Sequence, residues 1–97
     1  MDDALREAIS QVLARFPEIT AALLFGSRAK GGARAYSDID LALCGRVGDD
    51  TVQRVLYELD ELPTAYTFDL AAFDGVQDDA LRAHIERVGV LIYQKKA

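Results

Sequence analysis

The chain has 97 residues, of which 51% are hydrophobic and 28% charged, and its formal net charge is −5. This composition is that of an ordinary globular protein, it excludes a disordered or fibrous chain, and the length allows one domain with a single core. A general nucleic-acid binder would carry a strongly basic face, so the acidic balance argues against that class of function.

The single cysteine, Cys44, has no partner for an internal disulfide, which favours a reducing, cytoplasmic location. Its position at the end of a hydrophobic run predicts a small buried residue rather than a nucleophile. The first residues, MDDALREAIS, form a charged amphipathic start and not a signal peptide, and no apolar stretch approaches the ~20 residues that cross a bilayer. We therefore expect a soluble protein without a membrane anchor.

In chain order, the first element is an amphipathic helix. Apolar residues at three- and four-residue intervals from Leu5 to Phe16 predict it, and Pro17 stops it. Two strands follow: TAALLF (20–25), expected to be buried on both faces, and DIDLALC (38–44). Because they are neighbours in the sequence, these two strands are expected to pair with each other.

The second half continues with helices and strands in alternation. An apolar stripe from Val52 to Leu62 predicts a second helix, and TFDLAAF (67–73) predicts a third strand. A third helix is expected from Asp78 to Gly89, followed by a short strand, VLIY (90–93). The order α-β-β-α-β-α-β indicates a small α/β or α+β fold, a mixed sheet with helices packed on one side of it.

Two carboxylates lie two residues apart in the second expected strand. Side chains at positions i and i+2 point to the same face, so Asp38 and Asp40 should share the face opposite Ile39 and Leu41. A bare pair of this kind is often only a solvated strand face. Close carboxylates repel unless a cation lies between them, however, and Mg²⁺ prefers carboxylate oxygens together with substrate phosphates.

A basic loop that begins with glycine precedes this pair. Gly26 permits close backbone approach, Ser27 offers a hydroxyl and an amide, and Arg28 and Lys30 supply positive charge. Such a loop is typical of a phosphate-binding segment. In an acidic chain, this local excess of positive charge favours a small anionic ligand.

A third acid, Asp69, interrupts the apolar strand 67–73. It is either an exposed strand residue or, if this strand neighbours 38–44, a member of one cluster with Asp38 and Asp40. Three acids on two strands form a divalent-metal site suited to phosphoryl or nucleotidyl transfer. The nearby Asp74 precedes a glycine and is expected to be a turn residue.

The spacing of Gly26-Ser27, ten residues and Asp38-Ile39-Asp40 resembles the GS-x10-DxD signature of the DNA polymerase beta-like nucleotidyltransferases. The run LFGSRAKGGARAYSDIDLAL, together with FDLAAF and GVLIY, is similar to the minimal nucleotidyltransferases, the antitoxins of HEPN/MNT toxin–antitoxin pairs. The resemblance implies a nucleotidyltransferase fold. It also implies nucleotide-binding and metal-binding residues: Gly26, Ser27, Arg28 and Lys30 for the triphosphate of ATP, and the catalytic Asp38, Asp40 and Asp69 for two Mg²⁺ ions.

Members of this group transfer AMP from ATP to a tyrosine of the HEPN toxin and so silence its RNase activity. The resemblance implies the same reaction here, with the acceptor on a partner protein and Asp69 as the ligand or base that activates its hydroxyl. One alternative is an antitoxin that neutralises its toxin by binding alone. Transfer to a small molecule or an RNA end is a further possibility, which the short, acidic chain disfavours.

Three other polar residues have no single assignment to the site. Tyr36 borders the nucleotide or packs against the loop, and Arg34 reaches a phosphate or stays in solvent. His84 is expected to be a solvated residue of the last helix.

Overall fold

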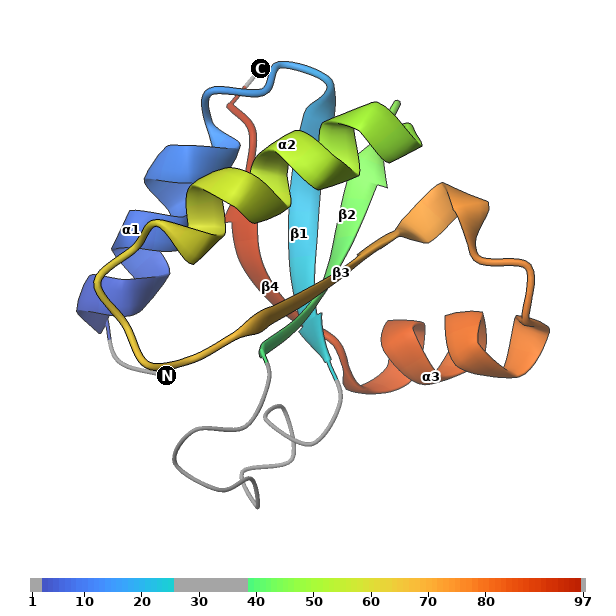
Figure 1. Cartoon of the computed structure of the whole chain (residues 1–97). Coiled ribbons are helices and arrows are strands. Elements are labelled where there is room, and N and C mark those ends of the chain that lie inside the picture. The colour runs from blue at the N-terminus through green and yellow to red at the C-terminus, as the bar shows by residue number, and fades with distance from the viewer. Residues whose placement is uncertain (1–2, 26–38, 97) are drawn as a thin grey trace.

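The computed structural model describes residues 3–25 and 39–96. Within these ranges the elements follow the expected order, with one short 3-10 turn added after the third strand (Figure 1). They are α1 (Asp3–Leu13), β1 (Ile19–Phe25), β2 (Ile39–Gly45), α2 (Asp49–Asp60), β3 (Phe68–Ala72), η1 (Phe73–Gly75), α3 (Asp79–Val88) and β4 (Val90–Gln94).

The four strands form one mixed sheet in the order β3-β2-β1-β4. β1 pairs antiparallel with both β2 and β4, whereas β2 and β3 are parallel. The expected pairing of the first two strands is therefore confirmed. Phe25 lies opposite Asp40, so the chain leaves β1 and returns into β2 at the same end of the sheet.

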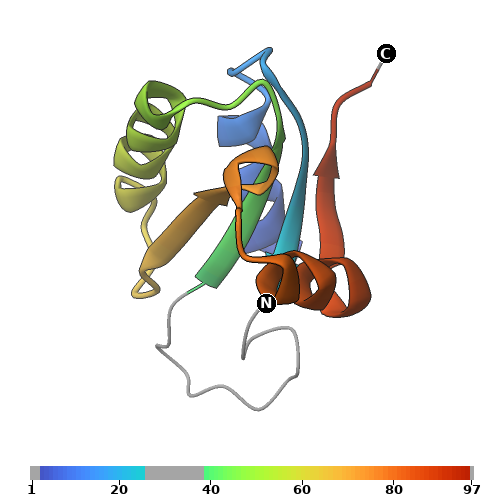
Figure 2. The same cartoon turned by 90° about the vertical axis from the view of Figure 1, so that its right-hand side faces the viewer.

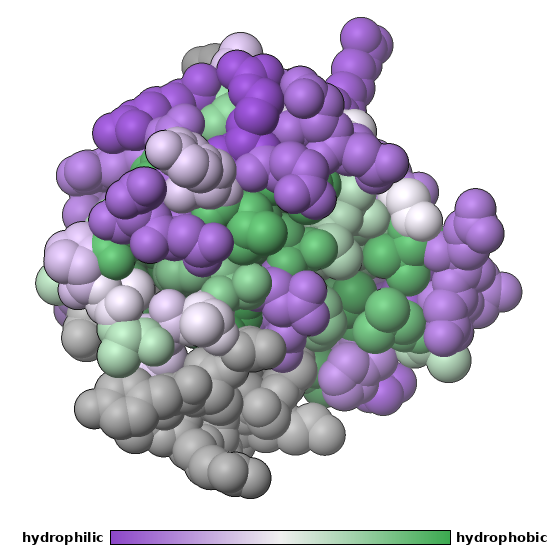
Figure 3. Space-filling model, in the orientation of Figure 1, coloured by the Kyte–Doolittle hydropathy of each residue, from purple (hydrophilic) through white to green (hydrophobic). Residues whose placement is uncertain are grey.

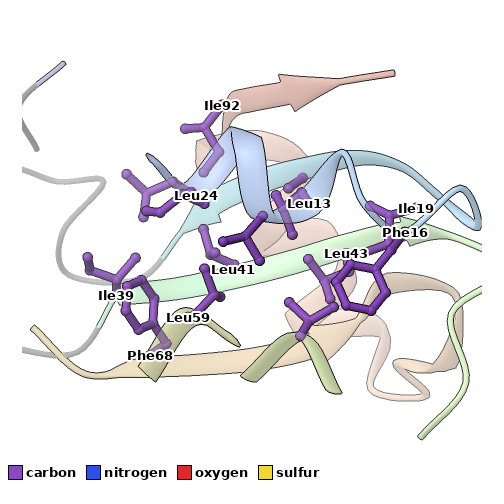
Figure 4. Close-up of a cluster of buried hydrophobic side chains, with 14 residues drawn as sticks. Leu13, Phe16, Ile19, Leu24, Ile39, Leu41, Leu43, Leu59, Phe68 and Ile92 are labelled. Atoms are coloured by element: carbon purple, nitrogen blue, oxygen red, sulfur yellow. The ribbon is translucent and has the colours of Figure 1, made fainter. Parts of the chain in front are cut away.

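The main hydrophobic core lies between one face of the sheet and the helices α1 and α2. Alternate residues of β2, Ile39, Leu41 and Leu43, are fully buried in this core (Figure 4). The helices contribute the apolar stripes that their spacing predicted. The buried helix side chains are Ile9, Val12, Leu13, Val55 and Leu59.

Helix α3 covers the opposite face, so the expectation that all helices pack on one side is wrong. Ile85 of α3 is fully buried but lies outside the main core cluster. Gly89, at the end of α3, lies close to Leu23, which alternates along β1 with the core residues Ala22 and Leu24. Figure 1 shows α3 well separated from α1 and α2, and Figure 2 shows α3 in front of the strands with α1 behind them. β1 is thus covered on both faces, with Leu23 only half-buried.

Local sequence signals explain where α3 begins. The Asp78 carboxylate accepts hydrogen bonds from the backbone N–H groups of Ala80, at 2.9 Å, and Leu81, at 3.3 Å. This is an N-cap, which satisfies amide groups that have no partner within the helix. In the described part of the chain, no helix has the length and apolar character needed to cross a membrane.

Candidate active site

Asp40 and Asp69 are brought together by the parallel pairing of β2 and β3, in which they are direct register partners. Their neighbours Ile39, Leu41 and Phe68 are buried in the main core. Because side chains alternate along a strand, both carboxylates stand on the opposite face of the sheet. Asp40 is half-buried there and Asp69 is exposed.

The two strands are fixed beside each other one step before the acids. The backbone N–H of Ile39 donates to the carbonyl oxygen of Thr67 at 2.8 Å, which aligns the first residues of both strands. The intervening helix α2 packs against β3 and supplies the crossover that a parallel pair requires. The condition on which the cluster depended, that strand 67–73 neighbours strand 38–44, is met, although Phe73, the last residue of that segment, belongs to the turn η1.

Several expected site residues lie outside the described residues. These are Gly26, Ser27, Arg28, Lys30 and Asp38, together with Arg34 and Tyr36. Within residues 3–25 and 39–96, no group of three or more His, Cys, Asp or Glu side chains is placed to hold a metal ion. The described part of the expected carboxylate cluster is therefore the pair Asp40 and Asp69.

This carboxylate pair fits a divalent cation. Like charges directly opposite each other on neighbouring strands destabilise a sheet, and a cation bound between them removes the conflict. Carboxylate oxygens are the ligands that Mg²⁺ prefers, and a site with one or two carboxylates leaves positions for substrate phosphates. The two strands thus supply protein ligands of the kind that a Mg²⁺–nucleotide complex requires.

Cys44 lies four residues after Asp40 on β2, on the same face of the strand. It is half-buried, less than its hydrophobic surroundings predicted, and it is a free cysteine. Burial raises the pKa of the Cys44 thiol, and the negative charge of Asp74 raises it further. Since the thiolate is the nucleophilic form, Cys44 is a poor nucleophile at neutral pH.

The other acid and the histidine singled out in the sequence, both within the described residues, do not join the carboxylate pair in a group of three placed to hold a metal ion. Asp74 is exposed within η1, which confirms that it is a turn residue. His84 is partly exposed on α3.

Arg82 is a residue whose role the sequence did not indicate. From α3, its Nη1 donates to the carbonyl oxygen of Phe73 at 2.9 Å, and its guanidinium stacks over the Phe73 ring, 4.5 Å from the centroid. Arg82 therefore ties α3 to the turn that ends β3, four residues after Asp69. No spacing rule distinguishes it from the neighbouring Arg87, because the contact depends on where α3 docks.

Residues 7–97 match the family described as "Polymerase beta, Nucleotidyltransferase". The chain therefore belongs to this family of nucleotidyltransferases. No curated protein matches the sequence.

Solved structures share the fold. A toxin–antitoxin complex with AMP-PNP superposes with a TM-score of 0.78 at 19% identity, over 94% of this chain and 74% of that one. The complex of a tri-AMPylated Shewanella oneidensis HEPN toxin with an MNT antitoxin gives 0.74 at 17% identity, over 98% and 74%. A putative nucleotidyltransferase from Sulfolobus solfataricus gives 0.56 at 22% identity, over 95% and 79%. The expected nucleotidyltransferase fold is thus confirmed.

Proposed function

We propose that this chain is a Mg²⁺-dependent nucleotidyltransferase that moves AMP from ATP to a tyrosine of a HEPN-type RNase toxin encoded by an adjacent gene, and so acts as its antitoxin. The observation that carries the proposal is the register pairing of Asp40 with Asp69 on the sheet face opposite α1 and α2. Membership of the nucleotidyltransferase family supports the reaction class. The fold shared with toxin–antitoxin complexes, one with AMP-PNP and one with a tri-AMPylated HEPN toxin, supports the nucleotide and the partner.

The proposed site has a metal-binding half and a phosphate-binding half. Asp40 and Asp69, with Asp38 two residues earlier in the sequence, would hold two Mg²⁺ ions. Bound there, the ions would neutralise phosphate charge and lower the pKa of the acceptor hydroxyl. The segment that begins with Gly26 and Ser27 and includes Arg28 and Lys30 would bind the triphosphate through backbone amides and positive charge. That segment starts directly after Phe25, the register partner of Asp40.

The exposed position of Asp69 suits it to the acceptor side of the reaction. The tyrosine oxygen forms a bond to the α-phosphorus of ATP, and the bond from that phosphorus to the oxygen bridging to the β-phosphate breaks. Pyrophosphate leaves, and the phenolic proton passes to the Asp69 carboxylate. The products are an AMP-tyrosine phosphodiester and pyrophosphate. Because the lone thiol needs no oxidising compartment, we place this reaction in the cytoplasm.

The proposal is tested by incubating the chain with labelled ATP, Mg²⁺ and the full-length HEPN protein of the adjacent gene. We expect the HEPN protein to gain the mass of AMP on a tyrosine. Asp40→Asn and Asp69→Asn should abolish the gain, whereas the matched control Asp74→Asn, in the exposed turn, should retain it. If the parent chain transfers no AMP, the proposed reaction is wrong. If Asp40→Asn protects cells from the toxin as well as the parent does, neutralisation occurs by binding alone.

A further inference from the structure

We infer that the protein acceptor binds by adding an extended segment as a new strand to the free edge of β3, with the acceptor tyrosine beside Asp69. This inference rests on the proposed function, because it specifies how the acceptor of that reaction is held. Addition of a peptide to an open sheet edge is a recurrent mode of recognition, in which main-chain hydrogen bonds provide affinity and alternate side chains provide specificity.

The first observation is the orientation of the β3 backbone. Among the described strands, β3 is at the end of the sheet and has β2 as its one neighbour. Ile39 pairs with Phe68 and donates its N–H to the Thr67 carbonyl, so Thr67 and Asp69 direct their main-chain groups toward β2. By alternation, the N–H groups of Phe68, Leu70 and Ala72 point away from β2, toward the open edge. The C=O groups of Phe68 and Leu70 point the same way, whereas the Ala72 carbonyl begins the turn η1.

The second observation is that the opposite edge of the sheet is protected. On β4, the Leu91 carbonyl accepts from Arg6 Nη2 at 3.2 Å, and the Ile92 carbonyl accepts from Ser10 Oγ, also at 3.2 Å. Both donors belong to α1, and the register of β4 against β1 is also irregular. Side-chain cover and irregular register are ways in which proteins block strand addition at an edge. The β3 edge is therefore the better template of the two.

The third observation is the surface along β3. Figure 3 shows hydrophobic residues in a band across the front of the molecule, where Figure 1 places β3, below the polar surface of α2. Leu70, Ala71 and Ala72 are each only half-buried. An added strand would cover part of this apolar surface, which favours binding in addition to the main-chain hydrogen bonds.

The geometry of the proposed reaction explains why the acceptor belongs at this edge. In an in-line displacement the attacking and leaving oxygens lie on opposite sides of the phosphorus. β1, whose last residue Phe25 precedes the proposed triphosphate-binding segment in the sequence, lies on one side of β2, and β3 lies on the other side. A residue of the added strand opposite Asp69 would share its face, with Cβ atoms about 5 Å apart. A tyrosine there would present its hydroxyl beside the carboxylate that we assign as base.

The test uses a proline that removes one edge donor without disturbing the sheet. Ala72 has a φ of −78°, which proline adopts, and its N–H points away from β2. We expect Ala72→Pro to raise the KM for the HEPN protein roughly tenfold and to leave the affinity for ATP unchanged. Ala72→Val, which has a side chain of similar size and keeps the N–H, should retain the parent KM. Equal KM values for the two variants would overturn the inference.

Amide hydrogen exchange gives a direct second measurement. In the complex with the HEPN protein, the N–H groups of Phe68, Leu70 and Ala72 should exchange at least tenfold more slowly than in the free chain. Exchange at Val90 and Leu91 of the opposite edge is the internal reference. Unchanged exchange at β3 alongside AMP transfer would refute strand addition and leave the proposed reaction intact. If exchange at β3 slows in the complex but no AMP is transferred, the proposed reaction is refuted instead. If exchange at β3 slows in a concentrated sample of this chain without the HEPN protein, a second copy of the chain occupies this edge, and acceptor docking there is refuted.

Discussion

Asp40 on β2 lies directly opposite Asp69 on β3, and the two side chains share the sheet face that α1 and α2 do not cover. A cross-strand pair of like charges lowers the stability of a sheet. A protein that binds a divalent cation gains a ligand set, so this pair is the feature on which the proposed chemistry depends.

We predict that Mg²⁺ stabilises the fold through this pair. At a Mg²⁺ concentration ten times its Kd, binding to the native state alone raises the Tm of a domain of this size by roughly 5–10 °C. Asp40→Asn and Asp69→Asn should lose most of this rise, because each removes one negatively charged ligand. Thermal unfolding followed by circular dichroism, with and without Mg²⁺, measures the effect.

The control for this prediction separates specific binding from screening of charge. NaCl at the same ionic strength should give a much smaller rise in Tm, because monovalent salt only weakens the repulsion. Asp74→Asn should respond to Mg²⁺ as the parent does. A parent chain whose Tm responds equally to the two salts would contradict a divalent site at Asp40 and Asp69.

Much of this arrangement is predictable from the sequence because strand alternation is a local property. The buried Ile39 and Leu41 place Asp40 on the other face, and Phe68 does the same for Asp69. The exact register between the strands is not local, since it depends on how the crossover helix α2 docks on the sheet. The residues before Ile39 that were expected to complete the site lie outside the described residues, so their roles stay predictions.

The position of α3 is a feature that the local sequence pattern does not determine. An apolar stripe with Ile85 at its centre indicates that one side of the helix is buried, and it does not indicate which face of the sheet receives it. The close approach of Gly89 to Leu23 decides the face, and this contact joins residues far apart in the sequence. The Arg82–Phe73 contact follows from the same docking and was unpredictable for the same reason.

We predict that Gly45→Ala strongly destabilises the protein. Gly45 ends β2 with a φ of +121°, a conformation that side chains other than glycine rarely adopt. A Cβ at this position would also collide with the backbone carbonyl of Glu18. We expect the free energy of unfolding to fall by about 3 kcal/mol, from backbone strain and the clash together. Urea unfolding measures the change.

The matched substitution is Gly75→Ala in the turn η1. A Cβ there would meet the Ala72 side chain at 3.8 Å, an ordinary contact distance, and φ lies outside the left-handed region. We expect a change below about 0.5 kcal/mol. Equal destabilisation by the two substitutions would show that the conformation assigned to Gly45 is wrong.

Glu18 predicts how stability depends on pH. A hydrogen bond from its own backbone N–H lowers the pKa of the Glu18 carboxyl first, followed by one from Thr51 Oγ1, which donates to Oε2 at 2.8 Å. Burial opposes these hydrogen bonds and raises the pKa, and the charge of Arg54, the smallest of the four causes, lowers it. Because the pKa is lower in the folded state, this contribution to stability is present above the ordinary glutamate pKa of about 4.3 and is lost as the pH falls through the folded value.

The measurement is urea unfolding between about pH 3 and pH 6, around the ordinary pKa of glutamate. Glu18→Gln should be less stable than the parent near pH 6, and the difference should shrink as the pH falls. Thr51→Val, which removes the buried hydroxyl, should flatten the profile in part, whereas Thr51→Ser keeps the donor and should follow the parent. A difference between Glu18→Gln and the parent that does not vary with pH would contradict this account.

Cys44 should react slowly with alkylating reagents in the native protein. Burial and the charge of Asp74 both raise the pKa of its thiol, so less thiolate is present at pH 8 than in a free cysteine, whose pKa is about 8.5. Unfolding in guanidinium removes both causes and should restore the ordinary rate.

Asp74→Asn should speed the native reaction of Cys44 modestly, because it removes the smaller cause, whereas Asp60→Asn on α2 should not change the rate. Iodoacetamide labelling followed by mass spectrometry measures these rates. If native and unfolded Cys44 react equally fast, the thiol is fully accessible, and its exclusion as a nucleophile no longer holds.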